Sequence, residues 1–473
     1  MSGSWANSAS AGGLDLHLQV DLAGKAGVRV ALERALRDAI RAGRLALGAR
    51  LPPSRTLAVD LGISRNTVAE AYAELVEEGW LTSRQGSGTY VAQRGRLDEP
   101  TRGPQRTLRP RTPNHDLMPG TPDASTFPRT AWLASARRAL TAAPHEAFGK
   151  GDPRGRIELR HALVEYLARA RGVRADINRI VVSSGCSHAL ALLAGVLPGA
   201  VAVESYGLYV HRDLFAESGV RTLPIGVDEH GARTDELART EAQTALLTPA
   251  HQFPMGGPLH PERRAAAVEW ARATGGIVIE DDYDGEFRYD RQPVGAVQGL
   301  DPDRVIYLGT ISKSLSPALR LGWMVLPGRL VEPVLAAKGG QERWASSLDQ
   351  LTLADFIESA GYDRHVRRMR LRYRKRRDQL VSLLAERAPH VRVTGIAAGL
   401  HAVLELPPGT EEATVAAGVR NGVNLEGLRP YRHPDADMAA PDGLVVSYGT
   451  PPDHAFSSAL DALCRTLRCR RRR

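Results

Sequence analysis

One lysine stands out among the residues that could do chemistry in this chain. The 62 basic residues are 57 arginines and only five lysines, at positions 25, 150, 313, 338 and 375. A lysine amine attacks a carbonyl carbon, whereas an arginine guanidinium stays protonated and does not. Lys313 follows the apolar run 305–308 and two hydroxyl residues, Thr310 and Ser312, and Arg320 comes seven residues later. This group predicts a site that holds a phosphate-bearing carbonyl compound through the Lys313 amine.

The segment Ser183–Ser187 has the composition of an anion-binding loop. It follows the apolar run 180–182 and opens a helical pattern that begins near His188. Backbone amides at the start of a helix bind phosphate, and small residues such as Gly185 and Cys186 let the anion approach. Many helices begin with such residues, so the segment indicates a phosphate site only in combination with Lys313.

An acidic segment supplies a carboxylate for the same site. Glu280-Asp281-Asp282-Tyr283 follows the apolar run 277–279. A solvated turn is the simplest interpretation of an acidic loop, but a buried strand before it would place these side chains where ligands bind. Pyridoxal phosphate (PLP) needs a lysine, a phosphate cradle and a carboxylate opposite its pyridine nitrogen. Lys313, the two segments above and Asp281 meet these needs, and Tyr283 is a candidate partner for the phenolic oxygen.

The part of the chain that carries these residues has an α/β pattern. Apolar runs followed by polar residues alternate with helical patterns; the runs are 180–182, 201–203, 245–247, 277–279 and 305–308. Such alternation predicts a mostly parallel sheet, whose ligands gather at the carboxyl ends of its strands.

The first part of the chain predicts a winged helix-turn-helix. Amphipathic spacing and terminal glycines indicate helices over 28–42, from Ser54 to about 62, and over 65–78. We expect Ser54 and Ser64 to be N-caps, and residues 80–84 and 89–91 to form a hairpin.

The exposed positions of this motif carry residues suited to DNA. Ser64 caps a helix whose first turn, Arg65-Asn66-Thr67, offers donors and acceptors to base edges and phosphates. Arg55 could reach a phosphate, and Gly86 and Gly88 would let the backbone of the wing approach the minor groove. A lone arginine is usually only a solvated charge, but the whole arrangement favours double-stranded DNA as a partner.

Composition divides the chain into segments. We expect a tail over 1–15, a DNA-binding domain over 16–92, a linker over 93–116 and a large domain over 117–473. The linker holds four prolines and six arginines.

Several classes of protein are disfavoured. Three cysteines without metal-binding spacing argue against a disulfide framework and against a metal site. The longest nearly apolar run, 189–203, is too short to cross a membrane, and residues 1–13 lack the features of a signal peptide. We therefore expect a cytoplasmic protein.

The arginine-rich stretches 363–380 and 465–473 are interpreted as a solvated helix face and a disordered tail rather than as DNA contacts.

Several motifs resemble known families. The segments 43–45, 51–55, 61–68 and 85–91 resemble the DNA-binding domain of the GntR class of bacterial regulators. The segments 152–155, 248–256, 280–289 and 312–320 resemble a fold-type I, class I/II aminotransferase. Together, in this order, the two parts resemble the MocR/GabR subfamily.

The resemblance implies specific roles. Lys313 would form the Schiff base with PLP, Asp281 would pair with the pyridinium nitrogen, and Tyr283 would bond the phenolic oxygen. Tyr206 would stack on the ring, and Arg429, with Arg432 as its rival, would receive an effector carboxylate. The phosphate would be held by Gly185, Cys186, Ser312 and Arg320, with Thr310 beside them.

Two residues and one short segment depart from the aminotransferase pattern. Phe253 replaces an asparagine that touches the phenolic oxygen, which puts turnover in doubt. Lys150 replaces a tyrosine that reaches the partner subunit's phosphate. Residues 185–188 read Gly-Cys-Ser-His, where a glutamine pair is more usual.

The leading hypothesis is a homodimeric, PLP-dependent transcriptional regulator that senses an amino compound or PLP itself. One alternative is a working aminotransferase with an appended DNA-binding domain. Another treats the large domain as a dimerisation scaffold without cofactor. Physiological catalysis is not the expectation, although residual transaminase activity is compatible with the sequence.

Overall fold

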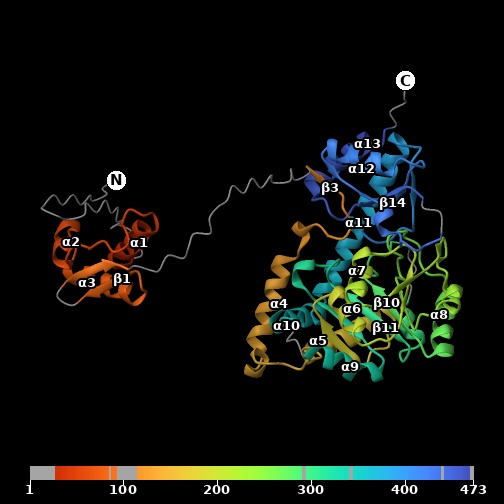
Figure 1. The fold of residues 1–473 in the computed structure, drawn as a ribbon, viewed down its shortest axis with the longest axis horizontal. Coiled ribbons are helices and arrows are strands. Elements are labelled where there is room, and N and C mark those ends of the chain that lie inside the picture. The colour runs from red at the N-terminus through yellow and green to blue at the C-terminus, as the bar shows by residue number, and fades with distance from the viewer. Residues whose placement is uncertain are drawn as a thin grey trace. The chain divides into compact units, whose positions relative to one another are not determined.

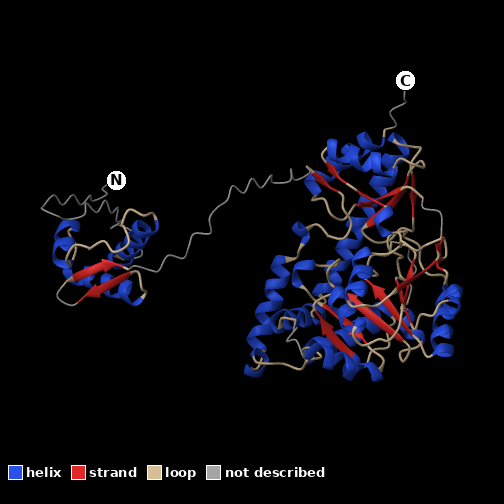
Figure 2. Cartoon of the chain, viewed as in Figure 1, coloured by secondary structure: helices blue, strands red, loops and turns tan. Residues whose placement is uncertain are grey.

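The chain forms two compact units in the computed structural model, residues 1–110 and 111–473. The structure describes residues 27–84, 87–92, 114–289, 295–339, 345–437 and 441–468. Both units contain helices and strands (Figures 1 and 2). The predicted tail 1–15, Gly86 and most of the predicted linker lie outside the described residues.

The small unit consists of three helices and a hairpin. The helices are α1 (Val28–Arg41), α2 (Ser54–Leu61) and α3 (Arg65–Glu77), and the strands β1 (Leu81–Arg84) and β2 (Gly88–Val91) pair antiparallel. Leucines from all three helices, among them Leu32, Leu57 and Leu75, are almost fully buried in one core. The Ser64 hydroxyl accepts a hydrogen bond from the Asn66 amide at 3.2 Å, as expected of an N-cap. Ser54 differs from its prediction, because it is the first helical residue and Pro53 occupies the cap position.

A seven-stranded sheet forms the centre of the large unit. Its order is β4-β12-β11-β10-β9-β5-β6, and β12 alone runs antiparallel to its neighbours. The strands are β4 (Ile180–Ser183), β5 (Val201–Glu204), β6 (Thr222–Ile225), β9 (Thr244–Leu247), β10 (Ile277–Asp282), β11 (Val305–Thr310) and β12 (Gly322–Val325). Ile180 and Val182 belong to one buried cluster and Val181 to another. Burial of both faces explains why these strands read as continuous apolar runs.

Four strands of the sheet lead directly or through a loop or short elements into a helix: β4 into α6 (Cys186–Ala194), β5 into α7 (Tyr209–Glu217), β9 into α8 (Pro261–Thr274) and β12 into α9 (Gly328–Gly339). The helices α4 (Arg129–Ala142) and α5 (Ile157–Arg171) precede β4, and α10 (Ser347–Glu358) and α11 (Gly361–Arg387) follow α9. Two short strands, β7 (Val227–Asp228) and β8 (Gly231–Ala232), form a separate pair.

The C-terminal part of the large unit has a smaller sheet of order β13-β14-β17-β16. Its strands are β13 (Arg392–Thr394), β14 (His401–Glu405), β16 (Glu426–Gly427) and β17 (Gly443–Ser447), with helices α12 (Glu411–Arg420) and α13 (Asp453–Leu467). In Figure 1 these blue elements gather at one end of the large unit, beyond β10 and β11.

The structure changes two predictions about polar segments. The predicted linker ends too late, because His115–Asp116 (β3) pairs with Val423–Asn424 (β15) inside the large unit. The stretch 363–380 lies on α11, but it is not a wholly solvated face. Arg376 is 3% exposed and pairs with Asp453 at 2.7 Å, since it lies on the side of α11 that packs inward.

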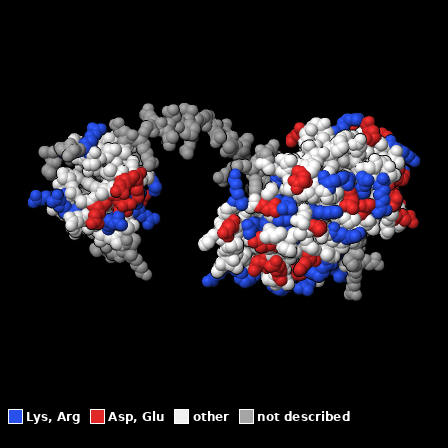
Figure 3. Space-filling view, turned by 90° about the horizontal axis from the view of Figure 1, so that it is seen from below, with Lys and Arg blue, Asp and Glu red and all other residues white. Residues whose placement is uncertain are grey.

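The C-terminal arginines are not all part of a disordered tail. Arg465 belongs to α13, whose apolar face is buried, and residues 469–473 lie outside the described residues. Acidic and basic side chains are interspersed over the face of the large unit shown in Figure 3, so the net charge of +9 does not mark this face as basic. Within the described ranges, no helix combines the length and apolarity that a membrane span requires.

Candidate functional site

A cavity of about 350 Å³ lies where the carboxyl ends of the central strands meet. Parallel strands bring residues that are distant in sequence to one edge of the sheet. Eight residues predicted for the cofactor site line this cavity: Gly185, Cys186, Asp281, Tyr283, Thr310, Ser312, Lys313 and Arg320.

One end of the cavity is built to hold an anion. Gly185, with φ +101°, leads into the first turn of α6, whose amides have no partners within the helix. A Cβ atom at Gly185 would lie 3.9 Å from Nη1 of Arg320, so the guanidinium lies against this helix start. The hydroxyls of Thr310 and Ser312 are 2.9 Å apart and face the same cavity. Amides, hydroxyls and a guanidinium are the donors that a phosphate group requires.

Lys313 has the surroundings of a reactive amine. Its Nζ donates a hydrogen bond to the carbonyl of Gly120 at 2.5 Å. Burial lowers the pKa of Lys313, while the carboxylates of Asp284 and Asp281 act in the opposite sense. A lowered pKa increases the fraction of neutral amine, which is the form that attacks an aldehyde.

Asp281 is the strand-end acid that faces the cavity. The Cys186 thiol donates to its Oδ1 at 3.5 Å. Burial is the main cause that raises the pKa of Asp281 to about 7. A buried carboxylate gains stability from a cationic neighbour, so this position fits a protonated pyridine nitrogen. With Lys313 and the anion cradle, the donor set therefore fits PLP.

Strand pleating decides which acid of β10 faces the cavity. Successive side chains of a strand point to opposite faces, so Glu280 and Asp282 point away from Asp281. Glu280 accepts the amides of Val297 and Gln298 at 3.0 and 2.9 Å. Asp282 forms a buried ion pair with Arg171, at 2.6 Å between Oδ2 and Nε. These two acids are therefore structural.

The structure does not place Tyr206 at the predicted ring-stacking position. Its side chain is 3% exposed, does not line the cavity, and packs against Val403, Leu428 and Tyr431. The next turn of the chain supplies the cavity wall instead, through Leu208, Tyr209 and His211. The loop after β5 turns Tyr206 toward the C-terminal sheet, and its stacking on a bound ring stays a prediction.

The predicted carboxylate receptor is also displaced. Arg429 is exposed in a short helical turn, and neither it nor its rival Arg432 lines the cavity. Besides Arg320, the arginine that lines the cavity is Arg212 of α7. Arg212 donates to the carbonyls of Gly207, Tyr431 and Pro430, at 2.9 to 3.2 Å.

The three departures from the aminotransferase pattern have different structural outcomes. Phe253 lines the cavity, and its ring centroid lies 5.7 Å from that of Tyr283 and 5.0 Å from that of His401. Lys150 is exposed and does not line the cavity. His188 Nδ1 accepts the Ser184 amide at 3.0 Å, so it braces the phosphate loop.

Several cavity residues escaped the sequence analysis. Glu204, at the end of β5, accepts the hydroxyl of Thr248 at 2.5 Å and the amide of Gln252 at 3.1 Å. His211, Asp284 and His401 also line the cavity. Glu204 has a signal in the sequence, because it directly follows an apolar run. His211, Asp284 and His401 do not belong to a repeating apolar pattern that would show which way their side chains point.

Buried ionisable groups predict how stability of the cofactor-free protein depends on pH. Burial is the main cause that raises the pKa of four carboxyls to about 7; these belong to Glu204, Glu280, Asp281 and Glu286. Their stabilising contribution is complete below about pH 4 and is lost progressively as the pH rises to about 7, because over this range the folded state holds protons that the unfolded chain has released. Burial also lowers the pKa of His401 to about 3 and those of His211 and His365 to about 4. The stability that comes from burying these neutral histidines is lost as the pH falls below about 6.5, because the unfolded chain then binds protons that the folded state does not.

Between about pH 4.5 and about pH 6.5 the four carboxyls outnumber the three histidines, so we expect the free energy of unfolding to fall with rising pH by roughly 1 kcal/mol per unit. The fall should continue to about pH 7 and end near about pH 8, where the carboxyls are ionised in both states. Urea unfolding from about pH 4.5 to about pH 8 measures the effect. Glu204→Gln should make the decline shallower, because the amide does not titrate. A free energy that rises between about pH 5 and about pH 7 would contradict the assignment.

The small unit presents its predicted DNA-binding residues to solvent. Arg55, Arg65 and Asn66 are exposed, and Thr67 is half-buried, at the starts of α2 and α3. Gly88 has φ +113°, and a Cβ atom there would lie 3.1 Å from Nε of Arg50. A side chain would therefore crowd the turn of the wing.

Arg65→Ala is expected to weaken binding to DNA from the protein's own upstream region by about 1–3 kcal/mol, because the variant loses a contact from the first turn of α3. Mobility-shift titration at fixed salt measures the loss. Arg34→Ala, which removes an exposed arginine of α1, is the matched control and should bind almost normally. Equal losses in both variants would contradict a specific role for Arg65.

Comparison with known proteins agrees with this two-part organisation. Residues 29–91 match the family described as bacterial regulatory proteins, gntR family, and residues 120–434 match aminotransferase class I and II. An archaeal alanine:glyoxylate aminotransferase structure shares the fold of the large unit, with a TM-score of 0.69 and 24% identity. The match covers 74% of this chain and 90% of that one.

Several relatives that match most of this chain are named as transcriptional regulators. The pyridoxine biosynthesis regulator PdxR of Corynebacterium glutamicum is 31% identical, over 89% of this chain and 91% of that protein. The probable rhizopine catabolism regulatory protein MocR of Rhizobium meliloti is 32% identical, over 86% and 87%. The transcriptional regulator YhdI of Bacillus subtilis is 35% identical, over 82% and 85%. The chain therefore belongs to the MocR- and PdxR-type HTH transcriptional regulators, in which a gntR-family DNA-binding domain precedes a class I and II aminotransferase domain.

Proposed function

We propose that this protein is a PLP-binding transcriptional regulator whose affinity for DNA changes when an amino compound, or PLP itself, occupies the cavity. The observation that carries the proposal is the convergence of the Lys313 amine, the Asp281 carboxylate and an anion cradle in one cavity. The same chain carries a gntR-family DNA-binding unit.

Each group would have a defined task. Lys313 would hold the aldehyde carbon, the start of α6 and Arg320 would hold the phosphate, and Asp281 would face the pyridine nitrogen. PLP supplies an electrophilic carbon that exchanges a lysine amine for a ligand amine. Phe253, Leu208 and Tyr209 would exclude water from one side of the cavity.

Regulation requires that the ligand favour one arrangement of the protein over another. A ligand shifts such an equilibrium only by its difference in affinity for the two states. Exchange of the Lys313 bond for a ligand bond would change which groups the cavity holds. A homodimer would present two DNA-binding units to an operator.

Spectral titration of the purified protein tests this proposal. PLP added to the cofactor-free protein should produce a visible absorption band, and one member of a panel of amino acids and amines, or PLP itself, should change the affinity for upstream DNA. Absence of any band would overturn the cofactor assignment. Steady transfer of amino groups to a 2-oxo acid, with no retardation of DNA, would favour the aminotransferase alternative.

A further inference from the structure

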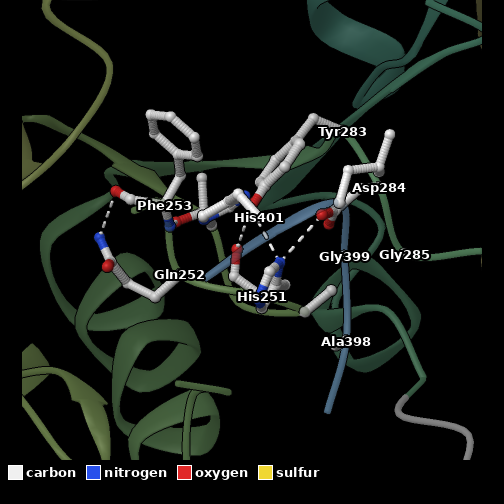
Figure 4. A network of polar contacts seen from close by, with 12 residues as sticks. His251, Gln252, Phe253, Tyr283, Asp284, Gly285, Ala398, Gly399 and His401 are labelled. Carbon is white, nitrogen blue, oxygen red and sulfur yellow. Dashed lines mark hydrogen bonds and ion pairs between the residues drawn. The ribbon is translucent and has the colours of Figure 1, made fainter. Parts of the chain in front are cut away.

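A compact polar network joins His251, Tyr283 and Asp284 (Figure 4). Tyr283 and Asp284 line the same cavity as Lys313. His251 Nδ1 lies 2.9 Å from Oδ2 of Asp284 and 3.0 Å from the hydroxyl of Tyr283. The Tyr283 hydroxyl donates to the carbonyl of His251 at 3.0 Å. A protonated Nδ1 therefore donates to the Asp284 carboxylate and keeps that side chain in place.

Asp284 has one oxygen that this network does not use. The side chain is 2% exposed and lines the cavity. Its Oδ1 is buried and has no hydrogen-bond partner among the described residues. A buried carboxylate oxygen without a partner costs free energy, unless a charged or hydrogen-bonding group comes to it. After burial, Asp284 is the first influence on the pKa of Lys313, ahead of Asp281.

The backbone fixes this pair rigidly. Gly399 has φ +70°, and a Cβ atom there would lie 2.3 Å from Cε1 of His251 and 2.6 Å from Oδ2 of Asp284. The Gly399 carbonyl accepts the hydroxyls of Tyr448, at 2.8 Å, and of Tyr289. Only glycine fits this close approach, so the backbone just before β14 packs directly on the His251–Asp284 pair.

The apolar ring of Phe253 lies next to Tyr283. Phe253 has no hydrogen-bonding side chain, and its ring packs edge-on against Tyr283. The Tyr283 hydroxyl therefore takes its partners from His251 rather than from residue 253.

We propose that Asp284, fixed by His251, is the counter-ion that holds the proton of the Lys313 amine and accepts a proton from the ammonium group of an entering ligand. This inference rests on the proposed PLP function. Proton transfer to Oδ1 turns the ligand ammonium into an amine and the carboxylate into a neutral acid; the amine then has the lone pair that it needs to replace Lys313. His251 is a positioning residue, since it acts through Asp284.

Other charged and titratable groups surround the same point, and the test must separate them from Asp284. Those that influence Lys313 or Asp284 are Cys186, His211, His251, Asp281, Tyr283, Tyr289, His401 and Tyr448. Asp284→Asn removes one negative charge and keeps the shape of the side chain.

The test is a pH titration of the visible absorption of the full-length protein loaded with PLP. A negative charge next to the lysine–cofactor bond favours its protonated form, so Asp284→Asn should lower the midpoint by about one to two pH units. His251→Gln should lower it by a smaller amount. Asp213→Asn makes the same chemical change at an exposed site on α7 and should leave the midpoint unchanged.

A second measurement uses the cofactor-free protein. The rate at which the band forms after PLP is added depends on the neutral fraction of Lys313, so its midpoint should also move to lower pH in Asp284→Asn. Wild-type midpoints in both variants, or an equal shift in Asp213→Asn, would overturn the inference. If Asp284→Asn does not retain PLP, the His251→Gln variant replaces it in the test. A lowered midpoint in His251→Gln then supports the inference, and a wild-type midpoint overturns it. Absence of a band in the wild type would overturn the proposed function instead.

Discussion

Lys313→Ala is expected to abolish the visible absorption band that PLP produces with the wild-type protein. The variant loses the only amine that lines the cavity among the described lysines, so PLP has no nitrogen there with which to form a covalent bond. The phosphate cradle remains, but it holds PLP only by noncovalent contacts. Absorption spectra before and after gel filtration measure both the band and the retained cofactor.

Stability provides an independent measure of the same change. A ligand present at 100 times its dissociation constant stabilises the folded state by about 2.7 kcal/mol. We expect wild-type protein to gain stability of this order from PLP, and Lys313→Ala to lose most of the gain at the same concentration.

Two other lysines test the specificity of this result. Lys375→Ala, at an exposed position on α11, should keep the wild-type band and serves as the matched control. Lys338 is buried, but its amine donates to the carbonyls of Pro153 and Val182, which assigns it a structural role. A full band in Lys313→Ala would exclude Lys313 as the cofactor lysine.

Arg171→Ala is expected to lower the free energy of unfolding of the large unit by about 3–5 kcal/mol. Arg171 and Asp282 are 5% and 4% exposed, and two hydrogen bonds, of 2.6 and 2.9 Å, join them. Asp282 also accepts the Tyr307 hydroxyl at 2.6 Å. Removal of the guanidinium leaves a buried carboxylate without its charge partner, close to Glu280 and Glu286.

Urea unfolding of the full-length protein measures this loss. The matched control is Arg221→Ala, which breaks the Arg221–Glu241 pair at 2.5 Å. Both side chains of that pair are more than 60% exposed, so its loss should cost less than about 1 kcal/mol. Similar losses in the two variants would contradict a special role for the buried pair. Because Asp282 adjoins Asp281, Arg171→Ala should also weaken retention of PLP.

Much of the fold and part of the site follow from local sequence. The sequence predicts Ser64 as a cap because a hydroxyl before a helical pattern satisfies a backbone amide within a few residues. It predicts that Lys313, Asp281 and the Gly185 loop lie together because apolar runs and helical patterns imply a parallel sheet, whose carboxyl ends share one edge. These conclusions need only sequence neighbours and a topology rule.

The direction of side chains on loops does not follow from the sequence, because no period relates sequence to direction there. Tyr206 packs against Val403, Leu428 and Tyr431, and Arg429 is exposed; neither lines the cavity. The misplaced end of the linker has the same cause: His115 and Asp116 are polar, and only their pairing with Val423 and Asn424 makes them a strand.

The sequence by itself determined the two-part organisation, the chemical type of the site and the lysine at its centre, since scarcity of lysine and strand-end positions are local facts. Only the tertiary structure decided that Asp281 rather than Asp282 faces the cavity, that Arg171 neutralises Asp282 across 111 residues of chain, and that His251 holds Asp284 beside Lys313. The physical reason is that burial and ion pairing decide which acidic side chain is structural and which one faces the cavity. Both depend on contacts between segments far apart in the chain.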